Sequence, residues 1–228
     1  MNAGVVALAN DGGVLEDTAF PYTRVEHGLE LQSTLDLESR LTDLEGFEVT
    51  VGTAAQETPN ESPSYRIGSD GTVTADNRRV ETETAASKVA YVEGEFLVTE
   101  SQQSEYALDI VDVALNNGSV KQATIDINGF LEAVDDLDPW MAGFYGRDAP
   151  VDAGNAFGDY DADANIRDVV AESQLNQLGL QNFIHNGRRM KFRITESGYV
   201  EIYRPNDVGT MEFVQFIRSR VLPHVQAE

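Results

Sequence analysis

Cysteine is absent from the 228 residues, and the chain has no long apolar run. Without cysteine, disulfide bonds and thiolate metal sites are excluded. No stretch approaches the roughly 18 consecutive apolar residues of a transmembrane helix, so no membrane association is expected. The N-terminal segment Met1–Ala9 has no basic residue before its apolar run, which argues against a signal peptide. We therefore expect a cytoplasmic protein.

Lysine is scarce: Lys88, Lys121 and Lys191 are the only three among 16 basic residues, and the rest are arginine. The 39 acidic residues outnumber them, which gives a net charge of −23 and an isoelectric point near 4.3. The acids are spread along the whole chain. This profile is typical of halophilic archaea, in which carboxylates keep proteins hydrated and multimolar salt screens their repulsion. An acidic mimic of DNA, or a surface for basic partners, is the alternative interpretation.

Motifs for catalysis are missing as well. The chain has no G-x-x-x-x-G-K-[ST], no G-x-G-x-x-G, no G-x-S-x-G and no H-E-x-x-H. Its three histidines, His27, His185 and His224, are scattered, and none has a second ligand at metal-binding spacing. His185 could serve as a general base because imidazole titrates near neutrality, but an exposed histidine beside a turn is the simpler interpretation. These absences favour a non-catalytic protein without a cofactor.

One segment, Asp159–Asn165, has the alternating carboxylates of a calcium loop. It lacks the glycine at the sixth position, where Ala164 stands, and the bidentate glutamate at the twelfth, where Val170 stands. In a chain this acidic such a triplet arises by chance. We therefore expect no metal site.

Hydrophobic patterning predicts an α+β fold in two lobes. Residues 1–146 form a mixed lobe with antiparallel hairpins, 147–164 an acidic Gly/Asp-rich connecting loop, and 165–228 a helix–hairpin–helix lobe. Strands are expected at Val5–Ala9, Phe47–Gly52 and Lys121–Ile127. Helices are expected at Thr34–Leu44, Glu105–Asn116, Gly129–Val134, Ile166–Leu178 and Met211–Leu222. Irregular loops are expected at Ala54–Ser64 and Pro139–Asp163.

Three hairpins have turns that fix a register. Gly71 and Gly94 end the first two turns, and Gly198, in the left-handed region, ends the third. The expected opposite pairs are Ile67 with Val73 in the first hairpin, Tyr91 with Phe96 and Val89 with Val98 in the second, and Ile194 with Val200 and Phe192 with Ile202 in the third.

The third hairpin also carries most of the clustered positive charge. Residues 181–228 have a net charge of +2, whereas residues 1–180 have −25. Cations that alternate with aromatic rings suit phosphate binding and base stacking. The alternative is that the outer face pairs with Glu201 and other acids, each pair contributing little. The candidate binding residues are Arg188, Arg189, Lys191, Arg193, Tyr199 and Tyr203, with Trp140 and Arg147 from the preceding aromatic-rich loop.

Together these features predict a non-catalytic interaction or regulatory protein of a halophilic archaeon. It would contact a protein partner or another anionic partner, with nucleic acid as a candidate, through the basic hairpin. One alternative is an enzyme with carboxylates from Asp135–Asp163 and His185 between the lobes. Another is a structural or assembly protein of a virus or complex, with hairpins as subunit contacts.

Overall fold

The fold is dominated by one antiparallel β-sheet. A computed structural model describes residues 1–9, 15, 20–26, 28–100, 105–115, 119–134, 138–146, 153–158, 170 and 173–226. Of these residues, 60 % are in strands and 18 % in helices. The expected α+β fold with a helix–hairpin–helix lobe is therefore wrong. The proposed division at residues 147–164 stays a prediction, because most of that loop lies outside the described residues.

Twelve strands form this sheet, and each pairs antiparallel with its neighbours. Along the sheet the order is β2-β3-β4-β5-β6-β1-β12-β11-β10-β8-β9, and β7 pairs with β1. The N-terminal strand β1 is therefore central and joins the first strands of the chain to the last. The strands are β1 (Ala3–Ala9), β2 (Phe20–Glu26), β3 (Leu29–Thr42), β4 (Glu48–Ile67), β5 (Val73–Val92), β6 (Phe96–Thr99), β7 (Val120–Gln122), β8 (Pro139–Tyr145), β9 (Gly154–Phe157), β10 (Gln174–His185), β11 (Arg188–Thr195) and β12 (Tyr199–Arg204).

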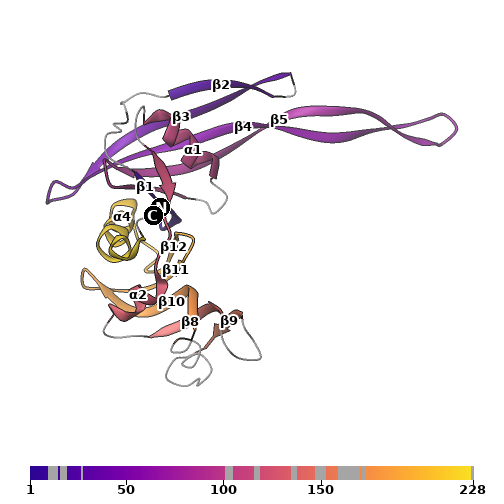
Figure 1. The fold of residues 1–228 in the computed structure, drawn as a ribbon. Coiled ribbons are helices and arrows are strands. Elements are labelled where there is room, and N and C mark those ends of the chain that lie inside the picture. Colours follow the sequence, from indigo (N-terminus) through magenta and orange to yellow (C-terminus); the bar gives the residue numbers. More distant parts are fainter. Residues whose placement is uncertain are drawn as a thin grey trace.

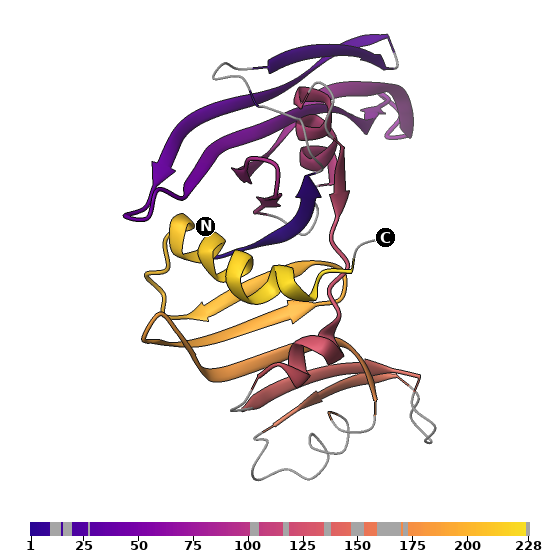
Figure 2. The same ribbon diagram turned by 60° about the vertical axis from the view of Figure 1, so that its left-hand side comes forward.

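Short helices cover this sheet. Figure 2 shows β3–β5 in purple above, β10–β12 in orange below, and the yellow C-terminal helix lying across the orange strands. That helix begins as α4, passes through a π-helical turn and ends in a 3-10 turn. The helical segments are α1 (Glu105–Ala114), α2 (Ile127–Glu132), α4 (Thr210–Phe216), η1 (Ile217–Val221) and η2 (Leu222–His224).

Two apolar clusters hold the helices on the sheet. Around α1, Ile110 and Val111 pack with Leu35 and Leu97 of the strands. The larger cluster joins α2 and the C-terminal helix to both halves of the sheet. At its centre Phe192 is fully buried, with its ring centroid 4.9 Å from that of Phe216. Burial on both sides of β1 makes the described sheet and its helices one packed body.

The helix expected at Thr34–Leu44 is strand β3. Its leucines fit a helical spacing, but the apolar alternation begins earlier, at Leu29. Leu31 and Leu35 are buried on one face of β3, and Leu44 lies in the following turn, fully exposed. The period-two pattern therefore prevailed over the helical one, since it extends through a longer segment.

Both expected loops contain strands. Ala54–Ser64 lies inside β4, and Pro139–Asp163 contains β8 and β9. The helix expected at Ile166–Leu178 is wrong at its C-terminal end, because β10 begins at Gln174, whereas Val170 is helical. Prolines suggested the first loop, but edge strands and bulges accept proline.

Several expected elements are confirmed. Strand β1 and helices α1 and α2 lie close to their expected positions, and α4 with η1 fills the last expected helix. Lys121–Ile127 is a strand only at its start, where β7 ends at Gln122. The first and third hairpins have the expected pairs, Ile67 with Val73 and Ile194 with Val200.

The register of the second hairpin is shifted by one residue. Val92 pairs with Phe96, so the turn has three residues with Gly94 at φ +69. Tyr91 consequently lies opposite Leu97, and Val89 opposite Thr99. All of β6 is buried, so alternation on this strand could not fix the register.

Candidate interaction site

Five of the residues expected from sequence come together on one face of the sheet. Trp140 of β8, Lys191 and Arg193 of β11, and Tyr199 and Tyr203 of β12 form this cation–aromatic face. The Lys191 ammonium lies 4.2 Å from the centroid of the Trp140 ring, and the Arg193 guanidinium 5.2 Å from that of Tyr199. Trp140 and Tyr203 meet edge to face at 5.6 Å. These five side chains, predicted as candidates from the sequence, therefore lie together in the structure.

The cations of this face already have partners. Arg193 forms an ion pair with Glu201 at 3.0 Å, and the Tyr203 hydroxyl donates to the same carboxylate at 2.7 Å. Burial, together with this hydrogen bond to Glu201, raises the pKa of Tyr203 to about 12. The negative charge of Glu201 therefore offsets that of Arg193, which leaves less attraction for a phosphate.

The remaining candidates are Arg188, Arg189 and Arg147. Arg188 is held by Glu212 at 2.5 Å and by Asp207. Arg189 is exposed at the start of β11, and Arg147 lies outside the described residues. The basic hairpin is thus more self-paired than its net charge suggested, and its binding role stays a prediction.

A glycine shapes the cation–aromatic face. A Cβ atom added at Gly179 of β10 would lie 2.6 Å from Cε2 of Trp140, so only glycine lets the indole pack flat on the strand. The Trp140 Nε1 is buried and has no hydrogen-bond partner among the described residues. The close fit against Gly179 indicates that this tryptophan is a packing residue of the sheet.

A second surface was not foreseen from the sequence. Strands β4 and β5 are 20 residues each and extend far beyond the rest of the molecule as a two-stranded ribbon (Figure 1). Strand β3 pairs with β4 only as far as Gln56, and β6 pairs with β5 only from Val89 to Val92. We call residues 58–82 the arm. Ten residues of strand at about 3.4 Å each give it a length of about 35 Å.

One face of the arm is apolar. Ile67 lies opposite Val73, and Tyr65, two residues earlier on β4, shares their face. A bulge adds a residue to β5 between Asp76 and Arg79, and beyond it Val80 pairs with Glu61. Because the bulge reverses the alternation of β5, Val80 also points to the face of Tyr65.

This apolar face is uncovered. The exposed fractions are 65 % for Tyr65, 74 % for Ile67, 64 % for Val73 and 37 % for Val80. The opposite face carries Thr58, Ser64, Arg66 and Thr74, which are polar and also exposed. The arm is therefore amphipathic although nothing in the described part of the chain packs against it.

Local sequence explains why the arm forms. At its tip Asp70 accepts hydrogen bonds from the backbone N–H and the hydroxyl of Thr72, at 3.1 and 2.7 Å, and Gly71 takes φ +82. In β4, Pro59 and Pro63 remove backbone donors, which is tolerated because its outer edge has no neighbouring strand there. Missing donors also discourage addition of a further strand to that edge. The face is thus better suited to contact than the edge.

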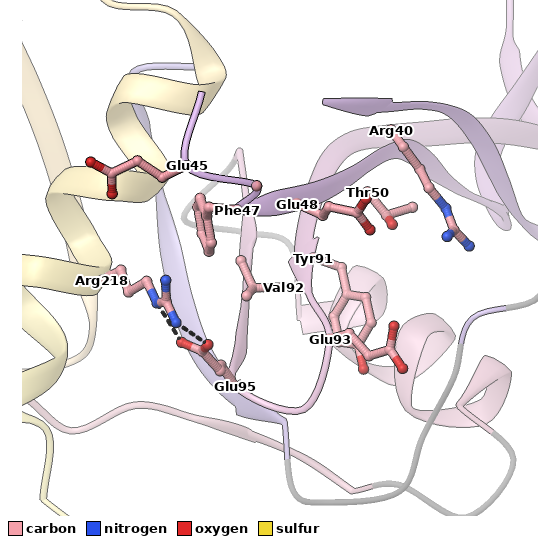
Figure 3. A pocket seen from close by; sticks show the side chains of 11 residues that line it. Arg40, Glu45, Phe47, Glu48, Thr50, Tyr91, Val92, Glu93, Glu95 and Arg218 are labelled. Carbon is pink, nitrogen blue, oxygen red and sulfur yellow. Dashed lines mark hydrogen bonds and ion pairs between the residues drawn. The ribbon is translucent and has the colours of Figure 1, made fainter. Parts of the chain in front are cut away.

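Charged residues line a cleft of about 460 Å³ beside η1 (Figure 3). Arg218 donates to both carboxylate oxygens of Glu95, at 2.8 and 2.5 Å, and lies over the ring of Phe47. Further acids line the cleft, but no histidine does. Arg218 therefore joins the C-terminal helix to the β5–β6 turn.

His185 is buried, not exposed as the simpler interpretation held. Its side chain is 2 % exposed, and neither ring nitrogen has a partner within the described chain. Burial, and then the charge of Arg220, lower its pKa. The acids proposed to act with it, and the calcium-like segment Asp159–Asn165, lie largely outside the described residues. The described part contains no cluster of three His, Asp or Glu that could hold a metal ion.

Comparison with known proteins finds no match among family models, curated proteins or solved structures. Among the described residues, no helix is long and apolar enough to span a membrane. The functional site is therefore inferred from the geometry of the described residues alone. The alternation around Tyr65 and Val73 was visible in the sequence, but the length of the arm was not.

Proposed function

We propose that this chain is a non-catalytic assembly protein that binds another protein subunit through the apolar face of its arm. The observation that carries this proposal is the exposure of Tyr65, Ile67 and Val73 on a ribbon about 35 Å long, which no other described strand supports. A two-stranded ribbon alone is marginally stable in water. A partner that covers the apolar face would stabilise it.

The chemistry of the arm fits a protein surface. Burial of one isoleucine or valine side chain contributes about 1.5–3 kcal/mol before association costs. Three or four such side chains can therefore anchor a contact between subunits. Clusters of exposed apolar residues on soluble proteins mark such contacts.

The charge of the chain favours the same contact. We infer a cytoplasmic protein of a halophilic archaeon, because −23 charges need screening by concentrated salt. Multimolar salt weakens contacts between cations and phosphates but leaves apolar contacts intact. A contact through Ile67 and Val73 would persist there, whereas one through Lys191 and Arg193 would weaken.

Substitution of the two faces tests this function. The apolar-face variant changes Tyr65, Ile67 and Val73 to serine, and the control variant changes Thr58, Arg66 and Thr74 to serine. Tagged proteins are recovered from cells of the source organism in about 3 M KCl, and the mass of each complex is measured by light scattering. We expect the control to retain the complex of the parent protein and the apolar-face variant to be recovered alone.

Both variants should keep the melting temperature of the parent, because all six side chains are exposed. Equal complexes from both variants would reject the arm as the binding element. Loss of binding on substitution of Lys191 and Arg193 instead would favour the basic hairpin.

A further inference from the structure

A second cleft lies on the other side of the C-terminal helix from the cleft of Figure 3. It has a volume of about 510 Å³, within the range of small-molecule sites. The end of α2, a bulge in β10 and the turns η1 and η2 enclose it. Its lining residues are Phe130, Ala133 and Val134, then Asn182, Phe183 and Ile184, and finally Ser219, Arg220, Pro223 and His224.

The walls of this cleft are mostly apolar, and their aromatic side chains are held in place. The Phe130 ring is buried and meets the His224 ring edge to face at 5.3 Å. Phe183 packs edge to face on Phe192 at 5.2 Å. Ile184 has no such cover and is 56 % exposed. An apolar ligand would therefore find preformed walls with one uncovered aliphatic side chain.

The bulge in β10 creates this opening. Gln181 and Asn182 lie opposite the single residue Lys191, and Asn182 takes φ +58. The carboxylate of Asp138 accepts hydrogen bonds from the side-chain amides of Gln181 and Asn182 and does not line the cleft. Bulges often reshape a strand beside a functional site.

The described lining of this cleft carries no negative charge. None of its described lining residues is a carboxylate, although 39 of the 228 residues are acidic. Arg220 is exposed, lies 5.7 Å from the Phe183 ring, and has no ion-pair partner in the described part of the chain. Arg218, two residues earlier, is by contrast held by Glu95. Among the described residues, Arg220 is therefore a cation without an ion-pair partner, at the rim of a mostly apolar cleft.

We propose that this cleft binds an aliphatic monocarboxylate, with the hydrocarbon chain on the apolar walls and the carboxylate on Arg220. A guanidinium group matches the two oxygens of a carboxylate. A single arginine beside apolar walls suits one small anionic group better than a polyphosphate, which needs several cations. This site is separate from the arm and does not depend on its function.

Calorimetry on the full chain in about 1 M KCl tests the proposal with octanoate, octan-1-ol and octyltrimethylammonium as probes. We expect octanoate to bind one to one and at least tenfold more tightly than the alcohol. Octyltrimethylammonium should not bind, because its charge repels Arg220.

Three variants assign the contacts. Arg220→Gln should weaken octanoate at least tenfold and change the alcohol less than twofold. Arg204→Gln, a substitution of another exposed arginine outside the cleft, should change neither affinity. Ala133→Trp should block both probes, because Ala133 is exposed on the cleft wall. Equal affinities for octanoate and octan-1-ol, no effect of Arg220→Gln, or no binding of octanoate would each overturn the proposal.

Discussion

At the scale of single residues, the stability of the C-terminal half depends on a few aromatic rings. Phe192 is fully buried and contacts three other phenylalanines, Phe130, Phe183 and Phe216. These rings come from β10, β11, α2 and α4. Loss of the central ring would therefore affect sheet and helices together.

We predict that Phe192→Ala lowers the free energy of unfolding by about 3–5 kcal/mol, through loss of burial and formation of a cavity. Chemical denaturation at constant high salt measures it. Lys191→Gln, at the preceding position, removes only a cation–aromatic contact, so it should lower the free energy of unfolding by less than about 1 kcal/mol. Similar costs for the two variants would contradict the core described for β11.

A second prediction concerns the buried His185. Its pKa is lowered in the folded protein, first by burial and then by Arg220. In the unfolded chain His185 therefore binds a proton more readily, with a pKa near the ordinary histidine value of about 6.5. Its contribution to stability is intact above that pH and is lost as the pH falls below it.

Unfolding measured at pH 7.5 and at pH 5.5 tests this sign. The parent protein should lose more stability between the two values than His185→Gln, which cannot be protonated there. An equal loss in both proteins would show that His185 does not control stability in this range.

At the scale of elements, the sequence predicted hairpins better than long strands. The turns ending at Gly71 and Gly198 fixed two registers correctly, because each lies between short alternating segments. The sequence predicted a helix at strand β3 because its leucines satisfy both the helical period and the period of two of a strand. The extension of β4 through Pro59 and Pro63 could not be inferred, because proline is accepted only where an edge has no neighbour.

The candidate site could likewise be predicted from the sequence only in part. Alternation placed Lys191, Arg193, Tyr199 and Tyr203 on one face correctly. The approach of Trp140 from β8 depends on strand order, which local sequence does not determine. The place of Val80 on the apolar face of the arm depends on a bulge in β5 that reverses the alternation, and a bulge has no reliable sequence signal.

We predict that the arm is dispensable for folding. Replacement of residues 59–82 by Asn-Gly would leave a short hairpin, because Thr58 lies opposite Glu83 at the base of the arm. The melting temperature should change by only a few degrees, since the body keeps its apolar clusters. Circular dichroism on heating measures it, and loss of cooperative unfolding would show that the arm supports the body.

At the scale of the whole molecule, the net charge of −23 sets the conditions under which the fold is stable. Self-repulsion destabilises a compact chain when screening is weak. We predict that the melting temperature rises between about 0.1 M and 3 M KCl, as the Debye length falls from about 10 Å to below 3 Å. An unchanged melting temperature would contradict the proposed halophilic origin.

We propose that the molecule joins an assembly through one face of its arm. Val73 and Thr74 are neighbours on β5 whose exposed side chains point to opposite faces of the ribbon. A photo-reactive benzoylphenylalanine at either position, irradiated in cells of the source organism, therefore samples one face at a time. We expect a protein adduct of one discrete mass from position 73 and none from position 74. Adducts of equal yield from both positions, or no adduct from position 73, would contradict the claim.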